Sequence, residues 1–211
     1  MKKIFVFFLC CLFIGTYVFT ASAHVPYIER SDYSEENPCR IWKMIEYSKA
    51  FYSWLQPTDE ICNDIDVFSF TIRQKPVNVY LELIVPDVEG IYDDFVPWYS
   101  LIGPGLPEIQ DDLPFTIPDG YGGIVMENVE PGEERESFYE PFGGKSYFSG
   151  PILDVNVSEP GDYKVYVWDP HEMCGDYVFV IGKGEFFGPF DIIRALINTV
   201  IIQMDGELHI E

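Results

Sequence analysis

A strict two-residue alternation over residues 77–85 constrains the fold of this chain more than any other feature. Its apolar members are Val77, Val79, Leu81, Leu83 and Val85. The positions between them carry Asn78, Tyr80 and Glu82, and Ile84 alone interrupts this polar side. Because successive side chains of an extended chain point to opposite faces, the pattern predicts a β-strand with one buried face.

Other segments rich in β-branched and aromatic residues follow at short intervals, separated by Pro and Gly. They are residues 66–72, 97–106, 152–157, 163–168 and 177–181. This spacing is typical of a sandwich of antiparallel sheets rather than of a parallel sheet. We therefore predict an all-β fold. Residues 24–38 are expected to form an irregular, extended arm. Residues 40–55 have mixed periodicity, which fits either a strand, a turn and a second strand or one amphipathic helix.

The first residues have the pattern of a signal peptide. Two lysines precede an apolar run over residues 4–14, and residues 21–23 (Ala-Ser-Ala) supply the small side chains that signal peptidase requires. Removal of residues 1–23 would make His24 the mature amino terminus. The apolar run is short and wrongly flanked for a stable transmembrane helix. We therefore expect a secreted, periplasmic or cell-surface protein that does not span a membrane after cleavage.

The mature chain divides into two parts. Residues 24–186 contain the predicted strands, with a long insertion rich in Gly, Pro and acidic residues at about 107–150. Long connections in a compact domain tend to be functional or mobile. Residues 187–211 form a C-terminal helix and tail that we expect to pack on the sandwich.

The C-terminal helix is predicted over Pro189–Met204, with Gly206 as its stop. Its polar residues fall close to one narrow stripe, made of Asp191, Arg194, Asn198 and Asp205. A helix so apolar elsewhere is buried against its own protein, which is the expected case, or it lies on a membrane or a partner.

The charge of the chain limits its partners. The formal net charge is −22, and loss of the two lysines in residues 1–23 makes it 11 − 35 = −24. Such a surface repels phosphate backbones, so nucleic acid is not an expected partner, whereas divalent cations and basic surfaces are. The aromatic content of 17% is ample for a core and argues against a disordered acidic chain.

Three cysteines remain after cleavage, namely Cys39, Cys62 and Cys174. An oxidising compartment favours one disulfide among them. We expect Cys39 and Cys62 to pair, because they lie near the ends of one early segment and would close a short loop. Cys174 would then be a free or buried thiol. The absence of a CxxC pair disfavours a zinc ribbon or a thioredoxin-type site.

Several of these segments share a pattern of turns and alternation. It reads Asp64-x-Asp66-x-Phe68-x-Phe70, Val77-x-Val79-x-Leu81, Pro160-Gly161-x-Tyr163-x-Val165-x-Val167 and Gly175-Asp176-Tyr177-x-Phe179. Over residues 45–85 and 160–181 the chain resembles the bacterial pre-peptidase C-terminal domain family. The resemblance implies a small jelly-roll-like β-sandwich and favours strands within residues 40–55. It also implies an accessory module that binds substrate polymers or calcium, or assists secretion, without being a catalyst. The insertion at 107–150 is longer than in that family.

A mature amino-terminal His24 suggests a copper site. Its α-amine and ring nitrogen can bind one Cu(II) together, and a second histidine would complete a histidine brace. His171, in a predicted turn, is the first candidate for that partner, and His209 is the other. A copper-binding protein or copper enzyme is thus the alternative function. A surface histidine and a flexible terminus explain the same residues without a metal.

Two groups of carboxylates suggest calcium. Asp59, Glu60, Asp64 and Asp66 precede one predicted strand, and Asp169, Glu172 and Asp176 lie around one predicted turn. Oxygen ligands from neighbouring loops suit Ca²⁺. In so acidic a chain, a solvated charged surface accounts for the same clusters.

No catalytic signature is present, so we do not expect an enzyme. There is no G-x-S-x-G, and Gly143-Gly144-Lys145-Ser146 lacks the first glycine of a phosphate-binding loop. Aromatic residues of the insertion and the strand before it could stack on sugar rings or fill the core. They are Trp98, Tyr99, Tyr121 and Tyr139. The leading hypothesis is an exported, non-catalytic binding or accessory module, stabilised by calcium, with a protein or polysaccharide ligand.

Overall fold

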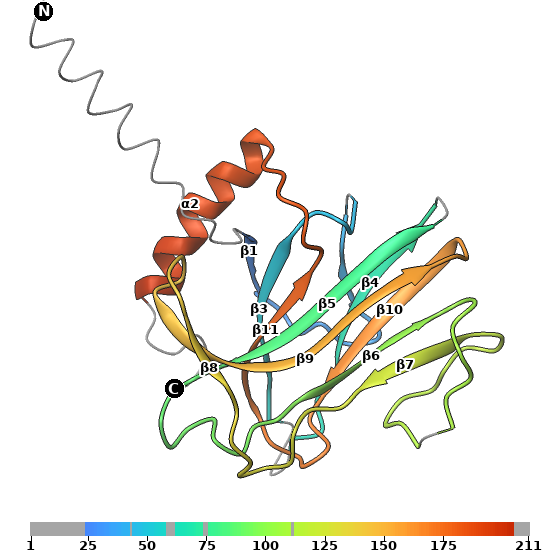
Figure 1. Ribbon diagram of the computed structural model, residues 1–211, viewed down its shortest axis with the longest axis horizontal. Coiled ribbons are helices and arrows are strands. Elements are labelled where there is room, and N and C mark those ends of the chain that lie inside the picture. Colours follow the sequence, from blue (N-terminus) through green and yellow to red (C-terminus); the bar gives the residue numbers. More distant parts are fainter. Residues whose placement is uncertain (1–23, 43, 58–61, 74–75, 111, 205–211) are drawn as a thin grey trace, which may run out of the picture.

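Two β-sheets face each other in the computed structural model, and one helix lies against an edge of the sandwich (Figure 1). The described residues are 24–42, 44–57, 62–73, 76–110 and 112–204. The predicted all-β, jelly-roll-like antiparallel sandwich with a C-terminal helix is confirmed. Only two of the strand pairs in this described part are parallel, β1 with β3 and β2 with β4.

The larger sheet has six strands in the described chain. In spatial order they are β1 (Val25–Ile28), β3 (Lys49–Leu55), β11 (Gly175–Ile181), β5 (Val77–Pro86), β9 (Lys145–Val157) and β8 (Ser137–Glu140). The smaller sheet has five, in the order β2 (Cys39–Arg40), β4 (Asp66–Ile72), β10 (Gly161–Trp168), β6 (Trp98–Gly103) and β7 (Gly122–Met126). Residues 40–55 thus contain the end of β2 and the whole of β3, so strands lie within this range, as the family resemblance indicated.

The core lies between the sheets. The alternation in β5 places Val79, Leu81 and Leu83 on the inner face, where each is fully buried. Aromatic rings meet across the interface, and the ring centroids of Phe68 on β4 and Phe179 on β11 are 4.5 Å apart. Each large apolar side chain buried in this way stabilises the fold by roughly 1.5–3 kcal/mol, so the inner faces hold the two sheets together.

The N-terminal segment is more ordered than the sequence suggested. Residues 24–38 were expected to be an irregular arm, but Val25–Ile28 pair in parallel with Lys49–Tyr52 as an edge strand. Val25 and Pro26 are buried there. An edge strand tolerates a proline because the missing N–H leaves no internal ladder bond unmade.

Part of the predicted insertion covers the outer face of the smaller sheet. Apolar residues of the segment 109–121 pack against Tyr166 and Trp168 of β10. The ring of Phe115 stacks on Tyr166 with centroids 3.9 Å apart. This segment therefore packs as a cover on the smaller sheet.

The expected disulfide is wrong. Cys62 is bonded to Cys174, with their Cα atoms 5.3 Å apart, and Cys39 is a free cysteine. Cys39 lies on β2 opposite Phe68. Phe68 follows Cys62 by six positions in the sequence. Sequence proximity favoured the short loop, but sheet pairing draws Cys39 away from Cys62 and brings the start of β11 towards it.

The helix α2 (Pro189–Met204) has the predicted bounds. It contacts β1, where the side-chain amide of Asn198 donates to the carbonyl oxygen of Pro26 at 2.9 Å. Its buried residues are Asp191, Ala195, Asn198 and Ile202, so the polar stripe faces the sandwich. Within the described ranges, no helix combines the length and apolar character that a membrane span requires.

Candidate metal centre

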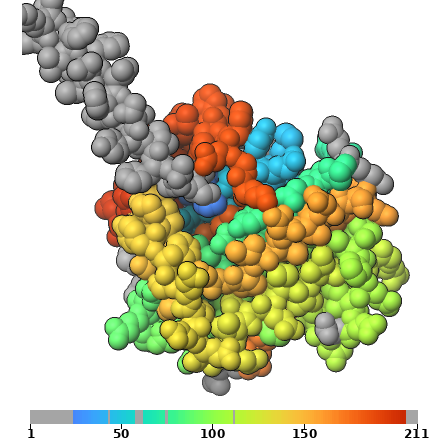
Figure 2. Space-filling view, in the orientation of Figure 1, coloured from blue at the N-terminus to red at the C-terminus, as the bar shows by residue number. Residues whose placement is uncertain are grey.

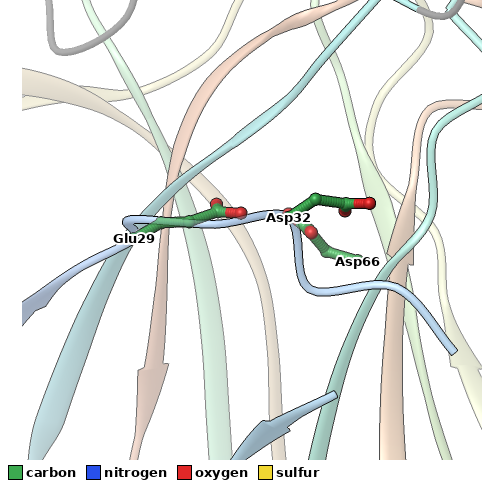
Figure 3. Close-up of side chains that lie close together, drawn as sticks. All are labelled: Glu29, Asp32 and Asp66. Carbon is green, nitrogen blue, oxygen red and sulfur yellow. The ribbon is translucent and has the colours of Figure 1, made fainter. Parts of the chain in front are cut away.

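Three carboxylates meet where the N-terminal segment passes from the larger sheet to the smaller one. Glu29 and Asp32 follow β1, and Asp66 is the first residue of β4. One carboxylate oxygen of each lies within 4.8 Å of the others. Figure 3 shows the three side chains close together, two from the N-terminal segment and one from β4.

Backbone hydrogen bonds fix this segment at both ends. The amide of Glu29 donates to the carbonyl oxygen of Tyr52 on β3 at 2.9 Å. Four residues later, the carbonyl oxygen of Tyr33 accepts from the amide of Val67 on β4 at 2.5 Å. The chain from Glu29 to Tyr33 therefore bridges the two sheets, and this bridge carries Glu29 and Asp32 to Asp66.

The two buried members of the cluster are only partly satisfied. Glu29 is 5% exposed and Asp66 is fully buried. Oε2 of Glu29 accepts from the backbone amide of Trp54 at 3.2 Å, and Oδ2 of Asp66 accepts from the hydroxyl of Tyr177. The Tyr33 amide is near enough to lower the pKa of Asp66. Even so, Oε1 of Glu29 and Oδ1 of Asp66 accept no hydrogen bond from the described residues.

Burial raises the pKa of Glu29 and of Asp66 well above the usual carboxyl range. The charge of Asp66 raises the pKa of Glu29 further, and Asp64 raises the pKa of both. Among the described residues, no Lys or Arg forms an ion pair with the cluster. Burying unpaired carboxylates is costly, so these groups keep a proton unless a cation compensates their charge.

The ligand set suits a hard divalent cation. All three members offer carboxylate oxygens, which Ca²⁺ accepts in varied geometries, whereas Zn²⁺ and copper prefer nitrogen and sulfur ligands. Mg²⁺ also takes oxygen ligands but demands near-ideal octahedral geometry. A cluster of two buried acids and one exposed acid, as here, can bind calcium and leave room for water on the Asp32 side.

Of the first predicted calcium group, Asp66 belongs to this cluster and Asp64 lies beside it. The oxygens of Asp64 accept from the amides of Gln56 and Ile65, each at 2.8 Å. Asp59 and Glu60 lie outside the described residues. Glu29 and Asp32 were not predicted as ligands from the sequence, although two acids closely spaced after a short apolar segment were the available signal.

The second predicted calcium group forms no site with three ligands in the described chain. Asp169 accepts backbone amides of Val96, His171 and Met173, so it holds its own turn. Oδ2 of Asp176 accepts from the hydroxyl of Tyr92 at 2.9 Å. Glu172 is exposed and has a left-handed backbone with φ of 60°. Of these acids, Asp169 thus holds the turn between β10 and β11.

The structure does not bring the two histidines of the proposed copper brace together. His24 precedes Val25, which pairs with Lys49 at the start of β3, while His171 precedes Gly175, which pairs with Leu55 at its end. The six intervening steps of β3 span about 20 Å. Nδ1 of His24 is hydrogen-bonded to the hydroxyl of Ser48, and burial lowers the pKa of His24 to about 4. His209 lies outside the described residues.

The predicted aromatic ligand residues divide between core and surface. Tyr99 is fully buried, and its hydroxyl donates to the carbonyl oxygen of Leu81 at 3.2 Å. Trp98 and Tyr121 pack in the cluster on the outer face of the smaller sheet. Tyr139 is 63% exposed and is the member of this set that lines a groove.

That groove has a volume of about 390 Å³ and lies on the outer face of the larger sheet. Its walls include Tyr52, Tyr80, Glu82, Tyr139 and Lys183. The hydroxyl of Tyr80 donates to Glu82 at 2.9 Å, and Nζ of Lys183 lies 5.5 Å from the Tyr80 ring centroid. Aromatic faces and charged groups therefore line one concave surface.

Comparisons with known proteins give likenesses to solved structures. No family model matches the chain, and no curated protein matches it in sequence. Among solved structures, it is similar to the pre-peptidase C-terminal domain of collagenase from Bacillus anthracis. The match covers 68% of this chain and 91% of that chain, with 14% identity and a TM-score of 0.35. The partial resemblance predicted from the sequence is thus found again. A likeness this distant concerns the course of the backbone and says nothing of function.

Proposed function

We propose that this protein is an exported, non-catalytic β-sandwich binding module that Ca²⁺ stabilises through Glu29, Asp32 and Asp66. The observation that carries the proposal is the pair of buried carboxylates, Glu29 directly after β1 and Asp66 at the start of β4. Each has an oxygen without a hydrogen bond, and no basic side chain compensates them in the described residues. A divalent cation would remove the cost of both unpaired groups at once.

Calcium bound here would link the two sheets. Glu29 and Asp32 lie on the segment that leaves the larger sheet, and Asp66 begins a strand of the smaller one. Ca²⁺ takes six to eight oxygen ligands, so water or backbone carbonyls would complete the shell on the exposed side. Binding to the folded chain alone would stabilise the folded state by mass action.

The groove on the outer face of the larger sheet supports the binding part of the proposal. Tyr80 and Tyr139 offer ring faces, and the side chains of Glu82 and Lys183 offer hydrogen-bonding groups within the same groove. Sugar rings stack on aromatic faces and present hydroxyls to such groups, and a peptide segment can use the same contacts. We infer that a polysaccharide or protein ligand binds in this groove.

Thermal unfolding with and without calcium tests the metal part. At a calcium concentration about a hundred times Kd, the expected stabilisation of about 2.7 kcal/mol raises Tm by roughly 5–10 °C for a domain of this size. The same titration is run on Glu29→Gln and on Asp66→Asn, in which the calcium-induced increment should fall below about a third of the parent value.

Glu172→Gln is the matched control. It makes the same chemical change at an exposed acid that was a sequence-based calcium candidate but lies outside the cluster, so it should retain the full calcium increment. Because Glu29→Gln also alters a buried group in the calcium-free protein, the increment is compared and not the absolute Tm. Equal increments in the parent and both cluster variants would show that calcium, if it binds, binds elsewhere.

A further inference from the structure

The helix α2 presents its polar residues to the sandwich and its apolar residues outward. Phe190, Leu196 and Met204 are 81%, 67% and 79% exposed. The other exposed large apolar residues of the helix are Ile192, Ile193, Ile197, Val200 and Ile201. Soluble monomers rarely expose a contiguous apolar surface of this kind, and such surfaces mark contact with another apolar phase or a partner.

Specific contacts fix this orientation. Besides the Asn198 hydrogen bond to Pro26, the guanidinium carbon of Arg194 lies 4.3 Å from the ring centroid of Tyr27. Ile202 is fully buried in a cluster with Tyr147 and Val180. Rotating the helix to bury its apolar face would break all three contacts, so the outward apolar face belongs to the folded state.

The apolar surface continues beyond the helix. Met44 and Phe186 are 54% and 56% exposed, and they line a hollow of about 260 Å³ together with Asp191 at the start of α2. The Phe186 ring stacks on Tyr47 with centroids 4.9 Å apart. Figure 2 shows α2 at the periphery of the molecule, beside the segment near residue 45. We call Met44, Phe186 and the outer face of α2 the apolar end.

We propose that the apolar end docks on the surface of a lipid bilayer, with α2 lying in the plane of the interface. The exposed residues of α2 are apolar apart from Gln203, whose amide already donates to the Phe142 carbonyl oxygen at 2.9 Å. Protein interfaces carry about one hydrogen bond per 100–200 Å², and this face offers almost no group for one. The apolar interior of a lipid bilayer requires no hydrogen bonds from the protein.

The course of the chain supports the same occupant. The apolar run of residues 4–14 ends shortly before β1, and β1 contacts α2. In a folded chain that keeps this run inserted in a membrane, β1 would hold α2 next to that membrane. A helix of 16 residues is about 24 Å long, which suits an interfacial orientation.

Charge selects the lipid. The chain carries a net charge of −22, and Arg194, the basic residue of α2, points at Tyr27. Anionic headgroups would therefore repel the protein, so docking should favour zwitterionic vesicles.

Vesicle co-sedimentation of the full chain, as its host produces it, tests this proposal. The parent protein is mixed with phosphatidylcholine vesicles and with vesicles that contain one third phosphatidylglycerol. The test variant is Ile193→Gln/Leu196→Gln/Val200→Gln. The matched control, Ile91→Gln/Ile152→Gln/Met173→Gln, changes three exposed apolar residues away from the apolar end. Circular dichroism should show both variants folded, because all six side chains are exposed.

We expect the parent and the control to bind phosphatidylcholine vesicles alike, more weakly when phosphatidylglycerol is present. The α2 variant should bind about tenfold more weakly or worse, since three apolar side chains no longer enter the lipid. Equal binding by the α2 variant would overturn the proposal, because another part of the chain would then account for it. Absence of vesicle binding would also overturn it, as would a dimer in sedimentation equilibrium that the α2 variant alone converts to monomer.

Discussion

Tyr177 on β11 donates its hydroxyl to the carboxylate of Asp66 on β4, so a hydrogen bond crosses the sandwich at the acidic cluster. Both residues are essentially buried. The bond satisfies one oxygen of Asp66 and leaves the other facing Glu29 and Asp32. It therefore fixes the one member of the cluster that comes from the smaller sheet.

Loss of this hydroxyl should weaken the calcium-free protein. In Tyr177→Phe, Asp66 loses its side-chain donor while the ring keeps its place in the core, and the free energy of unfolding should fall by about 1–3 kcal/mol. Urea denaturation at neutral pH measures this change. An unchanged free energy of unfolding would show that Asp66 does not depend on Tyr177.

The cluster also predicts how stability depends on pH. Burial raises the pKa of Glu29 and Asp66 in the folded protein. A carboxyl group with a raised folded pKa contributes stability that is fully present below its unfolded pKa and is lost as pH rises through the folded pKa. The folded pKa is about 8 for Asp66 and about 9 for Glu29. The calcium-free protein should therefore lose stability from about pH 4 to about pH 9, and Glu29→Gln should lose less. Equal slopes for the two proteins in urea titrations would contradict the raised pKa.

The disulfide makes a separate prediction. Cys62 and Cys174 are 112 positions apart in the sequence, and opening a loop this long typically costs about 2–5 kcal/mol. The double variant Cys62→Ser/Cys174→Ser should lose that much stability, whereas Cys39→Ser should change little. Peptide mapping without reduction identifies the pair directly. A Cys39–Cys62 peptide would contradict the structure.

The separation of the histidines predicts independent behaviour towards copper. Because His24 and His171 lie at opposite ends of β3, His171→Ala should leave the affinity for Cu(II) unchanged. A competition titration of the parent and the variant measures it. A tenfold fall in affinity would revive the histidine brace.

Local patterns in the sequence were enough to predict most of the strands. The alternation at 77–85 placed Val79, Leu81 and Leu83 on the buried face because one face of a strand in a sandwich must turn inward. The same reasoning predicted β4, β10 and β11. It could not predict β1, because Val25–Ile28 is short and its parallel pairing with β3 depends on a partner distant in sequence.

The candidate site depends on contacts that no local pattern contains. Glu29 and Asp66 are 37 positions apart, and only the bridge between the two sheets brings them together. The same holds for Cys62 and Cys174. For α2, the polar stripe was visible in the sequence, but its direction was not. The side-chain amide of Asn198 donates to the backbone carbonyl of Pro26 on an edge strand. This hydrogen bond keeps the polar stripe inward and the apolar face outward.

Calorimetric titration with calcium at neutral pH tests the central claim most directly, when it is performed in two buffers of different ionisation enthalpy. If Glu29 and Asp66 hold protons until a cation replaces them, calcium should bind with a stoichiometry near one and release protons, so the heat differs between the buffers. Glu29→Gln and Asp66→Asn should abolish most of this heat, and Glu172→Gln should not. Absence of binding heat in the parent, or the same heat in both cluster variants, would contradict a calcium site at Glu29, Asp32 and Asp66.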